Sequence, residues 1–239
     1  AMHYAKGKKK VLSVHGVYSD QVKIIHSTTT SKIAISIESK VLKWVDKLTT
    51  DSKISKEQYG KKLNLDFKYL PSPIETEMFK KIPEVKKSIN QVVYVGRDSF
   101  EKGIDTLRNI ESKINGTVVY CINKPWDETM KILKSSTLIV VPSRMESLPT
   151  VIKEAFYLKI PVIATSVGGI PELVTNNETG LLTEPENSQS LLKKINELLI
   201  DSQLQQKLSS NAYDFVVSNF TWKKILPSYI EFYKKLLND

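Results

Sequence analysis

The pattern of apolar and polar residues changes at the Pro-Ser-Pro segment 71–73. Before this segment, helical spacing predicts a helix at 38–48, and Asp51 or Ser52 is placed to cap a second helix that runs through Tyr59. Short apolar or alternating β-branched runs predict strands at 11–14, 22–25 and 33–37. Because two prolines fit neither a helix interior nor a central strand, we expect a domain boundary at 71–73.

Beyond this segment, apolar runs and helical patterns alternate regularly. The apolar runs predict strands at 92–95, 117–121, 137–141, 161–165 and 181–182. Helical spacing predicts helices at 104–114, 127–133, 150–158, 188–199, 202–219 and 222–237. Strands that alternate with helices across short loops indicate a parallel sheet covered on both faces. Ligands of such sheets bind at the carboxyl ends of the strands.

Composition excludes several classes of protein. The chain has 239 residues and is 41% hydrophobic and 26% charged, which is typical of a globular protein and not of a disordered tail or a fibre. Its single cysteine, Cys121, cannot form an internal disulfide. No apolar run approaches the roughly 18 residues that span a bilayer. We therefore expect a chain without a transmembrane segment.

Positive charge is concentrated in the first third of the chain. Residues 1–72 hold 14 Lys and 6 Asp or Glu, a net charge of +8, whereas residues 73–239 hold 21 basic and 20 acidic residues. This asymmetry indicates either an anionic surface met by the first third or a solvated lysine-rich face. Nucleic acid is not the expected partner, because the segment has few aromatic residues for stacking and no arginine for base readout.

Three loops follow predicted strands, and the first of them is 96–103. Gly96 allows close approach of the backbone, and Arg97 and Lys102 place two cations beside the helix predicted to begin near Gly103. This arrangement suits a phosphate or a diphosphate. A solvated surface loop is the alternative interpretation.

The second loop, 142–150, leads into the predicted helix that carries Glu154. The start of that helix, at Thr150 and Val151, offers backbone N–H groups to a phosphate. Glu146 in the loop and Glu154 in the helix offer oxygens to hydroxyl groups on either side of it. A molecule with hydroxyls on both sides of a diphosphate is a nucleotide-sugar. The alternative for Glu154 is an exposed helix carboxylate.

The third loop, 166–172, is expected to be structural. Gly168 and Gly169 follow a predicted strand and permit a tight turn with positive φ. Glu172 is expected to cap or pair locally.

The residues of these loops resemble a known family. The segments GRDSFEKG, PSRMESLPTVIKEA and PVIATSVGGIPELVTNNETGLL are similar to those of the family 4 retaining glycosyltransferases. Glu146 and Glu154 match the E-x7-E pair of that family. Weaker similarities occur at Val14-His15-Gly16, at 46–52, at 71–75 and at the last predicted helix, which opens at Phe220-Thr221-Trp222.

The resemblance implies an α/β protein of GT-B type, in which two Rossmann-like domains form the architecture. Residues 1–72 would be a truncated N-terminal Rossmann-like domain on the acceptor side. Residues 73–221 would be the C-terminal, donor-binding domain with a Rossmann-type parallel sheet, and residues 222–239 a helix that packs back toward the N-terminal domain. The upstream strands of the usual N-terminal domain are missing, which would leave an unpaired sheet edge.

The resemblance also implies roles for single residues. Arg97 and Lys102 would hold the donor diphosphate and stabilise the leaving group, Glu146 would bind the transferred sugar, and Glu154 would bind the ribose. His15 would contact the acceptor or the donor sugar, although a lone histidine at a strand end is more often structural. The expected catalytic residues are Arg97, Lys102, Glu146 and His15. The expected substrate-binding residues are Gly96, Arg97, Lys102, Ser143, Glu146, Ser147, Leu148, Pro149, Thr150, Val151 and Glu154.

By the same resemblance, the expected activity is transfer of a sugar from a nucleotide-sugar to an acceptor, a glycan or a lipid-linked sugar, with retention of configuration. The net charge of +8 in residues 1–72 is what suggests the lipid-linked acceptor. No metal and no cofactor are expected, because fixed cations can do the work of a metal and the nucleotide-sugar is a co-substrate. We expect a cytoplasmic protein, peripheral at an anionic membrane. The alternative is a non-catalytic nucleotide-sugar-binding module, or a subunit whose N-terminal domain a partner chain completes. An epimerase or phosphorylase of the same architecture fits the E-x7-E pair less well.

Overall fold

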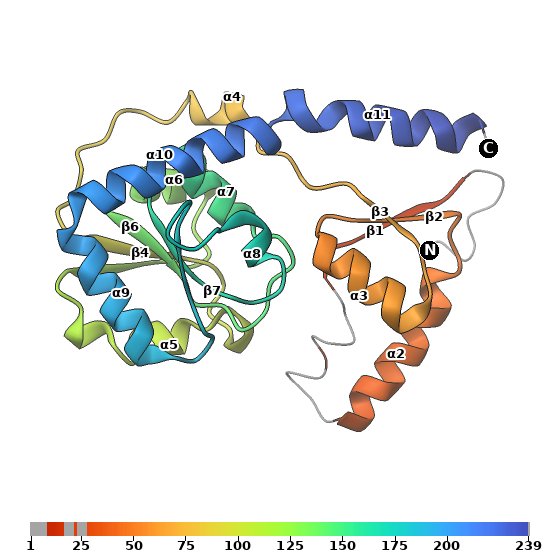
Figure 1. Ribbon diagram of the computed structural model, residues 1–239, viewed down its shortest axis with the longest axis horizontal. Helices are drawn as coiled ribbons and strands as arrows, with labels where there is room; N and C mark the ends of the chain where they lie inside the picture. The colour runs from red at the N-terminus through yellow and green to blue at the C-terminus, as the bar shows by residue number, and fades with distance from the viewer. Residues whose placement is uncertain (1–8, 17–21, 23–27, 239) are drawn as a thin grey trace. The chain divides into compact units, whose positions relative to one another are not determined.

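The computed structural model describes residues 9–16, 22 and 28–238, and the chain divides into two compact units (Figure 1). The smaller unit contains Ala1–Ser72 and Lys223–Asp239, and the larger contains Pro73–Trp222. Each unit is built on its own parallel sheet. The strand predicted at 22–25 lies outside the described residues except for Val22, which is helical and not extended.

The larger unit contains a five-stranded parallel sheet with the strand order β5-β4-β6-β7-β8. Its strands are β4 (Gln91–Val95), β5 (Thr117–Cys121), β6 (Leu138–Val141), β7 (Val162–Thr165) and β8 (Leu181–Thr183). All four residues of β6 and all four of β7 are buried. Such uninterrupted apolar runs arise where helices cover both faces of a sheet. The predicted parallel sheet is therefore confirmed.

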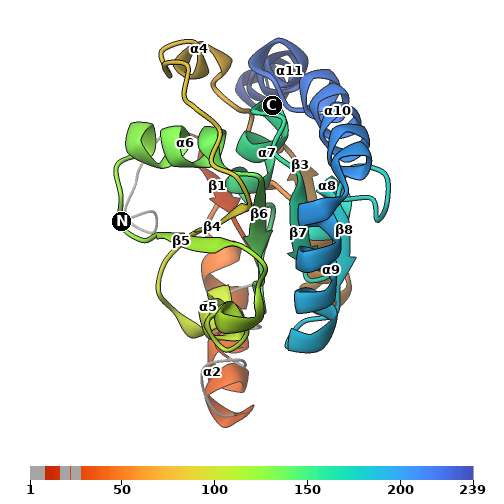
Figure 2. The ribbon, with the colours of Figure 1, turned by 90° about the vertical axis from the view of Figure 1, so that its left-hand side faces the viewer.

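Helices cover both faces of this sheet: α5 and α9 lie on one side of the strands, and α6, α7 and α10 lie on the other (Figures 1 and 2). The helices of the unit are α4 (Thr76–Phe79), α5 (Ile104–Arg108), α6 (Trp126–Ser135), α7 (Thr150–Tyr157), α8 (Ile170–Leu173), α9 (Ser188–Ile200) and α10 (Ser202–Asn219). Among the described residues, no helix combines the length and the apolar character that crossing a membrane requires.

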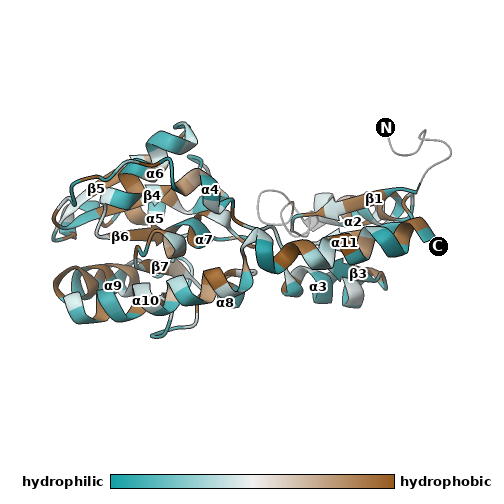
Figure 3. Cartoon of the chain, turned by 90° about the horizontal axis from the view of Figure 1, so that it is seen from above, coloured by the Kyte–Doolittle hydropathy of each residue, from teal (hydrophilic) through white to brown (hydrophobic). Residues whose placement is uncertain are grey.

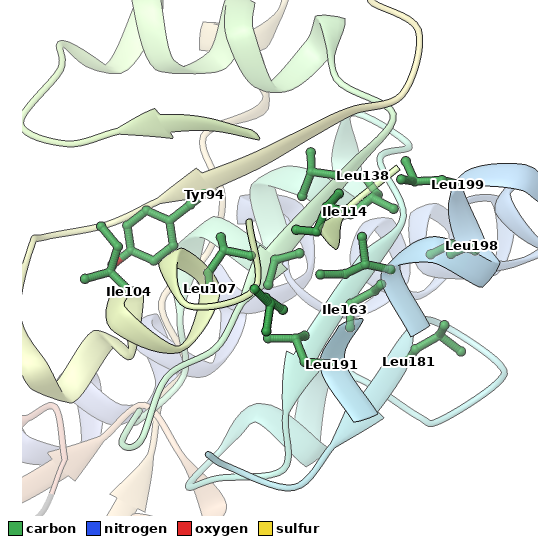
Figure 4. Packing of buried hydrophobic residues seen from close by; sticks show 14 of the residues in the cluster. Tyr94, Ile104, Leu107, Ile114, Leu138, Ile163, Leu181, Leu191, Leu198 and Leu199 are labelled. Atoms are coloured by element: carbon green, nitrogen blue, oxygen red, sulfur yellow. The ribbon is translucent and has the colours of Figure 1, made fainter. Parts of the chain in front are cut away.

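The core beneath α5 and α9 joins side chains that are far apart in the sequence (Figure 4). Tyr94 and Leu138 from the sheet meet Leu107 of α5 and Leu191 of α9, and all four are nearly inaccessible to solvent. Alternate residues of each strand face this side, as the period of two in a strand requires. This core fixes the sheet edge from which the functional loops leave.

One predicted helix in this unit is not a continuous α-helix. The helix expected at 104–114 is a five-residue helix, α5, followed by a short 3₁₀ helix at Glu111–Lys113. The predicted apolar face is nevertheless buried, from Ile104 to Ile114. The sequence pattern therefore predicted correctly which side chains are buried. The backbone differs because i→i−3 hydrogen bonds, such as that from Lys113 N–H to Ile110 O, give a 3₁₀ turn in place of a continuous α-helix.

In the part of the smaller unit that the structure describes, a three-stranded parallel sheet, β1-β2-β3, occurs together with helices. Its elements are β1 (Val11–Val14), α2 (Thr28–Leu42), β2 (Lys47–Thr50), α3 (Lys53–Leu63), β3 (Phe67–Tyr69) and α11 (Trp222–Asn238). Ser52 caps α3 by accepting a hydrogen bond from Ser55 N–H, which confirms one of the two predicted caps. Tyr229 of α11 donates a hydrogen bond to Leu70 O at 3.3 Å, so the last helix packs within this unit.

Two predictions in the smaller unit are wrong. Residues 33–37, predicted as a strand, lie inside α2, and the helix predicted at 38–48 ends at Leu42 and gives way to β2. The buried face of α2 is formed by Ser31, Ala34, Glu38 and Leu42, which recur at helical spacing. Ile33 and Ile37 are instead exposed.

The last helix is amphipathic, with apolar and polar residues alternating in patches along its length (Figure 3). Ile225 and Leu236 are buried, and Tyr229 between them is partly buried. A second apolar row remains exposed: Trp222, Leu226, Ile230, Tyr233 and Leu237. The apolar arc of α11 is thus wider than the face that the smaller unit covers.

Candidate functional site

The three predicted loops leave one edge of the larger sheet. Strand β4 pairs with β6, and β6 pairs with β7, all in parallel. Their carboxyl ends therefore meet at the same edge, and the loops 96–103, 142–149 and 166–169 follow directly from them. The expected convergence of these loops is confirmed.

Two glycines let neighbouring loops touch. Gly103 has φ +63°, and a Cβ on it would lie 2.0 Å from Pro142 O. Gly168 has φ +49°, and a Cβ on it would lie 1.8 Å from Glu146 O. The backbone of the second loop therefore lies in contact with both other loops. Glu172 falls in the first turn of α8.

Arg144 fastens the first loop to the second. Its guanidinium donates to both carboxylate oxygens of Asp105 at 2.7 Å each and to Phe100 O at 2.7 Å. It also contacts Glu186 at 2.9 Å and lies 4.0 Å from the centroid of the Phe100 ring. Its planar fork suits this two-pronged contact, and its hydrogen bonds lower the pKa of Asp105. Sequence reasoning had not selected Arg144.

Lys102 and Glu146, predicted from different loops, form an ion pair. Lys102 Nζ lies 2.8 Å from Glu146 Oε1, and Ser143 Oγ donates to the same oxygen at 2.8 Å. The side chain of Glu146 is only 9% exposed, and that of Lys102 is 25% exposed. Both contacts are to Oε1, so within the described part of the chain Oε2 remains open to the hydroxyl of a ligand.

Arg97 lies in the loop that follows β4, at the same edge of the sheet. Its backbone is fixed because the Tyr94 hydroxyl donates to Arg97 O at 2.7 Å. Its side chain is 70% exposed and pairs with Glu101 at 2.9 Å. Gly96 immediately precedes Arg97. A Cβ added to Gly96 would lie 2.9 Å from the Tyr94 hydroxyl oxygen, so a larger residue there would crowd this hydroxyl. Arg97 and Lys102 thus flank the loop as predicted, but Arg97 must leave Glu101 to contact a diphosphate.

The start of α7 supplies the predicted backbone donors. Pro149 occupies the N-cap position, and no side chain caps this helix. Leu148 is buried and anchors the turn, while Thr150 is exposed and Val151 is partly exposed. Uncapped N–H groups in a first helical turn are suited to an anion. Ser147, which precedes this turn, is partly buried.

Glu154 is held by a residue that sequence reasoning missed. The indole Nε1–H of Trp126 donates to Glu154 Oε1 at 2.8 Å. Burial raises the pKa of the Glu154 carboxyl, and the Trp126 hydrogen bond opposes that rise. Glu154 is therefore not the freely exposed helix carboxylate that was the alternative. Trp126 follows β5, so the signal that could have revealed it was a fourth loop at the same sheet edge.

His15 belongs to the smaller unit and is described within it. It follows β1, and its Nδ1 lies 2.8 Å from Asp51 Oδ2, just after β2. Its side chain is 58% exposed, whereas that of Asp51 is 7% exposed. Ser13 Oγ lies 3.4 Å from Nε2. A buried carboxylate thus orients an imidazole that is itself more than half exposed.

Comparisons with known proteins show sequence similarity to glycosyltransferases. Residues 109–215 match the family described as glycosyl transferases group 1. An uncharacterized glycosyltransferase from Methanocaldococcus jannaschii is 35% identical over 113 residues, which cover 47% of this chain and 32% of that protein. The chain therefore spans about a third of the length of this relative.

Solved structures show the fold. Sucrose-phosphate synthase from Thermosynechococcus elongatus superposes with a TM-score of 0.80 at 21% identity, covering 95% of this chain and 68% of that one. HepE from Anabaena, solved in complex with UDP-glucose, gives a TM-score of 0.78 at 18% identity over 95% of this chain and 72% of that one. The fold is the α/β GT-B fold. Over residues 109–215, the chain is similar to the glycosyl transferases group 1 family.

Proposed function

We propose that this chain transfers a sugar from a nucleotide-sugar donor to an acceptor, with retention of configuration. The observation that carries the proposal is the cluster of Lys102, Glu146 and Ser143 at the carboxyl edge of the sheet, beside the uncapped start of α7. A cation, a carboxylate with one open oxygen and free backbone N–H groups suit a sugar linked to a diphosphate.

Each residue of the site has a proposed role. Arg97 and Lys102 hold the diphosphate and stabilise negative charge on the leaving group. Glu146 binds hydroxyls of the transferred sugar, and Glu154 binds the ribose. Backbone groups at Gly96 and from 147 to 151 approach the sugar and the phosphates. Lys102 is already held at the site by its pair with Glu146, and Arg97 joins it by leaving Glu101, so the proposed transfer needs no metal ion.

The comparisons support a nucleotide-sugar as the donor. HepE, which shares the fold, is solved with UDP-glucose. The residues proposed to bind the donor, from Gly96 to Glu154, all lie in the larger unit. That unit has a hydrophobic core of its own. His15 is proposed to contact the acceptor or the sugar from the smaller unit, with Asp51 as its orienting partner.

A screen of nucleotide-sugars with mass detection of product tests this proposal. We expect one donor to stabilise the protein, and both Arg97→Ala and Glu154→Ala to weaken its binding by about tenfold or more, since a hydrogen bond to a charged group contributes about 1.5–3 kcal/mol. Lys131→Ala, which removes an exposed cation paired with Asp127, is the matched control and should bind normally. Failure of every donor to bind would overturn the proposal.

We also propose that the acceptor is presented at an anionic membrane. Within residues 1–72, which carry a net charge of +8, α2 exposes Ile33 (58%) and Ile37 (56%) beside Lys32 and Lys40. Exposed aliphatic residues flanked by lysines are typical of helices that lie in a membrane interface. A lipid-linked sugar is the acceptor that such a surface would serve.

Vesicle co-sedimentation checks this second proposal. The double variant Ile33→Glu/Ile37→Glu should sediment less with anionic vesicles, because it removes apolar contact and reduces positive charge, and each basic residue near such a surface contributes about 1 kcal/mol. Ile89→Glu changes an isoleucine in the larger unit that is still more exposed, at 90%, and this variant should sediment like the unmodified chain. Equal sedimentation with neutral and anionic vesicles would contradict the proposal.

The edge of the smaller sheet favours one alternative function. Its strand order is β1-β2-β3, and β1 has no partner beyond β2 within the described residues. A partner chain could add a strand there and complete the unit, making this chain the donor-binding subunit of a split enzyme. Sedimentation velocity combined with an assay distinguishes the two, because a monomer that turns over donor and acceptor unaided excludes the split enzyme.

A further inference from the structure

Trp126 makes the only hydrogen bond from one side chain to another that the described residues show for Glu154. It is the first residue of α6, directly after the loop that leaves edge strand β5. Its Nε1–H lies 2.8 Å from Glu154 Oε1, across 28 positions of sequence. A fourth strand end therefore contributes to the site that the other three loops form.

The indole of Trp126 is held from two sides. Pro125 occupies the N-cap position of α6, and its ring fixes the backbone that enters the helix. The edge of the Phe79 ring meets the indole at 5.2 Å between centroids, with an angle of 76° between the planes. Phe79 is itself buried and lies 4.7 Å from the Tyr157 ring, on the helix that carries Glu154. Because both neighbours are fixed, the indole N–H keeps its direction without a ligand.

This contact determines how Glu154 meets a ligand. An ionised carboxylate only accepts hydrogen bonds, and an indole only donates one. Trp126 occupies Oε1, and in the described part of the chain Oε2 remains open. A carboxylate fixed through one oxygen presents the other in a set direction. The two lone pairs of that oxygen allow it to accept hydrogen bonds from two adjacent hydroxyls.

We propose that Trp126 is a positioning residue of the donor site, which orients Glu154 to accept hydrogen bonds from the vicinal diol of a ribonucleoside diphosphate. The contact thereby makes the site prefer ribonucleotides over 2′-deoxyribonucleotides. This inference rests on the proposed function, because it assigns Glu154 to the nucleoside of the donor. It adds the residue that fixes Glu154 and the chemical group that the pair selects.

A double-mutant cycle tests the proposal. UDP, GDP and ADP, each with its 2′-deoxy counterpart, are titrated into the unmodified chain, Trp126→Phe, Glu154→Gln and the double variant. Trp126→Phe keeps an aromatic ring near Phe79 and removes the N–H donor together with part of the ring volume, which is why the ratio of ribo to deoxy affinities is the readout. We expect it to weaken binding of the preferred ribonucleotide about tenfold, and to remove most of the preference over the deoxy form. Where turnover is measurable, KM for the donor should rise while kcat stays nearly constant.

The double variant shows whether Trp126 acts through Glu154. We expect it to bind no more weakly than Glu154→Gln alone, since the two residues serve one contact. Tyr120→Phe is the matched control: it also removes a donor to a carboxylate, that of Glu111, in a hydrogen bond that is exposed to solvent. Its affinity and its preference for ribonucleotides should match those of the unmodified chain.

The outcomes separate this inference from the proposed function. If Glu154→Gln weakens binding and Trp126→Phe leaves both affinity and the ribose preference unchanged, the inference is wrong and the proposed function stands. Additive losses in the double variant would also overturn it. If none of the six nucleotides binds the unmodified chain, the proposed function itself fails. The ratio of ribo to deoxy affinities is measured on folded protein, so partial loss of stability does not affect it.

Discussion

Replacing Lys102 with alanine is expected to lower kcat/KM for the donor by about 10²–10³-fold, as removal of one preorganised charge-stabilising donor does in other enzymes. The ammonium of Lys102 lies 2.8 Å from Glu146 in a pair that is largely buried, so the charge is already placed where the diphosphate would bind. Steady-state kinetics over a range of donor concentrations, or donor affinity by calorimetry, measures the effect.

Stability must be separated from chemistry in this experiment. Lys102→Ala leaves the carboxylate of Glu146, 9% exposed, with the Ser143 hydroxyl and no cation, which should cost about 1–3 kcal/mol of unfolding free energy. Combining Lys102→Met with Glu146→Gln removes both charges together. The combination should recover much of the stability without recovering activity, because a buried pair can be replaced as a unit more cheaply than it can be broken.

An exposed ion pair in the same unit serves as the control. Lys193 and Glu197 are 3.8 Å apart on the surface of α9, where an ion pair contributes between about 0 and 1 kcal/mol. Lys193→Ala should therefore leave both activity and stability nearly unchanged. Near-normal turnover by Lys102→Ala would remove this lysine from the proposed mechanism.

The donor-side architecture could be predicted because local pattern and tertiary environment agree there. The apolar run of β6 is buried on both faces, and the helical positions Leu107, Ile152 and Ile195 all point into the core. Once the strands are parallel, the loops after β4, β6 and β7 must meet at one edge, which brings Lys102 to Glu146 without further information. The roles assigned to these residues stay predictions.

The smaller unit was harder to predict because its burial does not follow hydrophobicity. In α2 the inward face includes Glu38, whose carboxylate accepts a hydrogen bond from the buried Tyr59 hydroxyl, while Ile33 and Ile37 face outward. The alternation of isoleucine with small residues at 33–37 therefore indicated a strand. The hydrogen bond between Tyr59 and Glu38 instead accompanies a helix with Glu38 on its buried face. Because its two partners are 21 positions apart, no local sequence pattern could reveal it.

The same reason explains the two site residues that were missed. Arg144 reaches Asp105 across 39 positions, and Trp126 reaches Glu154 across 28. Residue type and spacing identify groups that suit a ligand, but the partner that orients each group is set by the fold. Such orienting contacts become visible only when the strands are placed beside one another.

Replacing Gly168 with alanine is expected to destabilise the larger unit and to abolish most donor binding. The backbone at Gly168 has φ +49°, a conformation that costs a residue with a Cβ about 1–2 kcal/mol. The added Cβ would also lie 1.8 Å from Glu146 O and 2.9 Å from Glu146 C. Both atoms are backbone, so no side-chain rotation can relieve the contact. Thermal unfolding and donor titration measure the two effects.

Donor binding should be lost because Glu146, a residue of the proposed site, must move to make room for the added Cβ. Relief of the contact displaces the backbone of Glu146, and with it the oxygen that Lys102 and Ser143 hold. A displacement of about 1 Å at such a site can cost a hundredfold in rate. Gly60→Ala is the matched control, because the nearest atom to its Cβ would be Leu65 O at 3.8 Å and it lies inside helix α3. That variant should be neutral or slightly stabilising, since alanine favours a helix interior by about 1 kcal/mol over glycine. Normal affinity in Gly168→Ala would mean that the position of Glu146 is not set by the third loop.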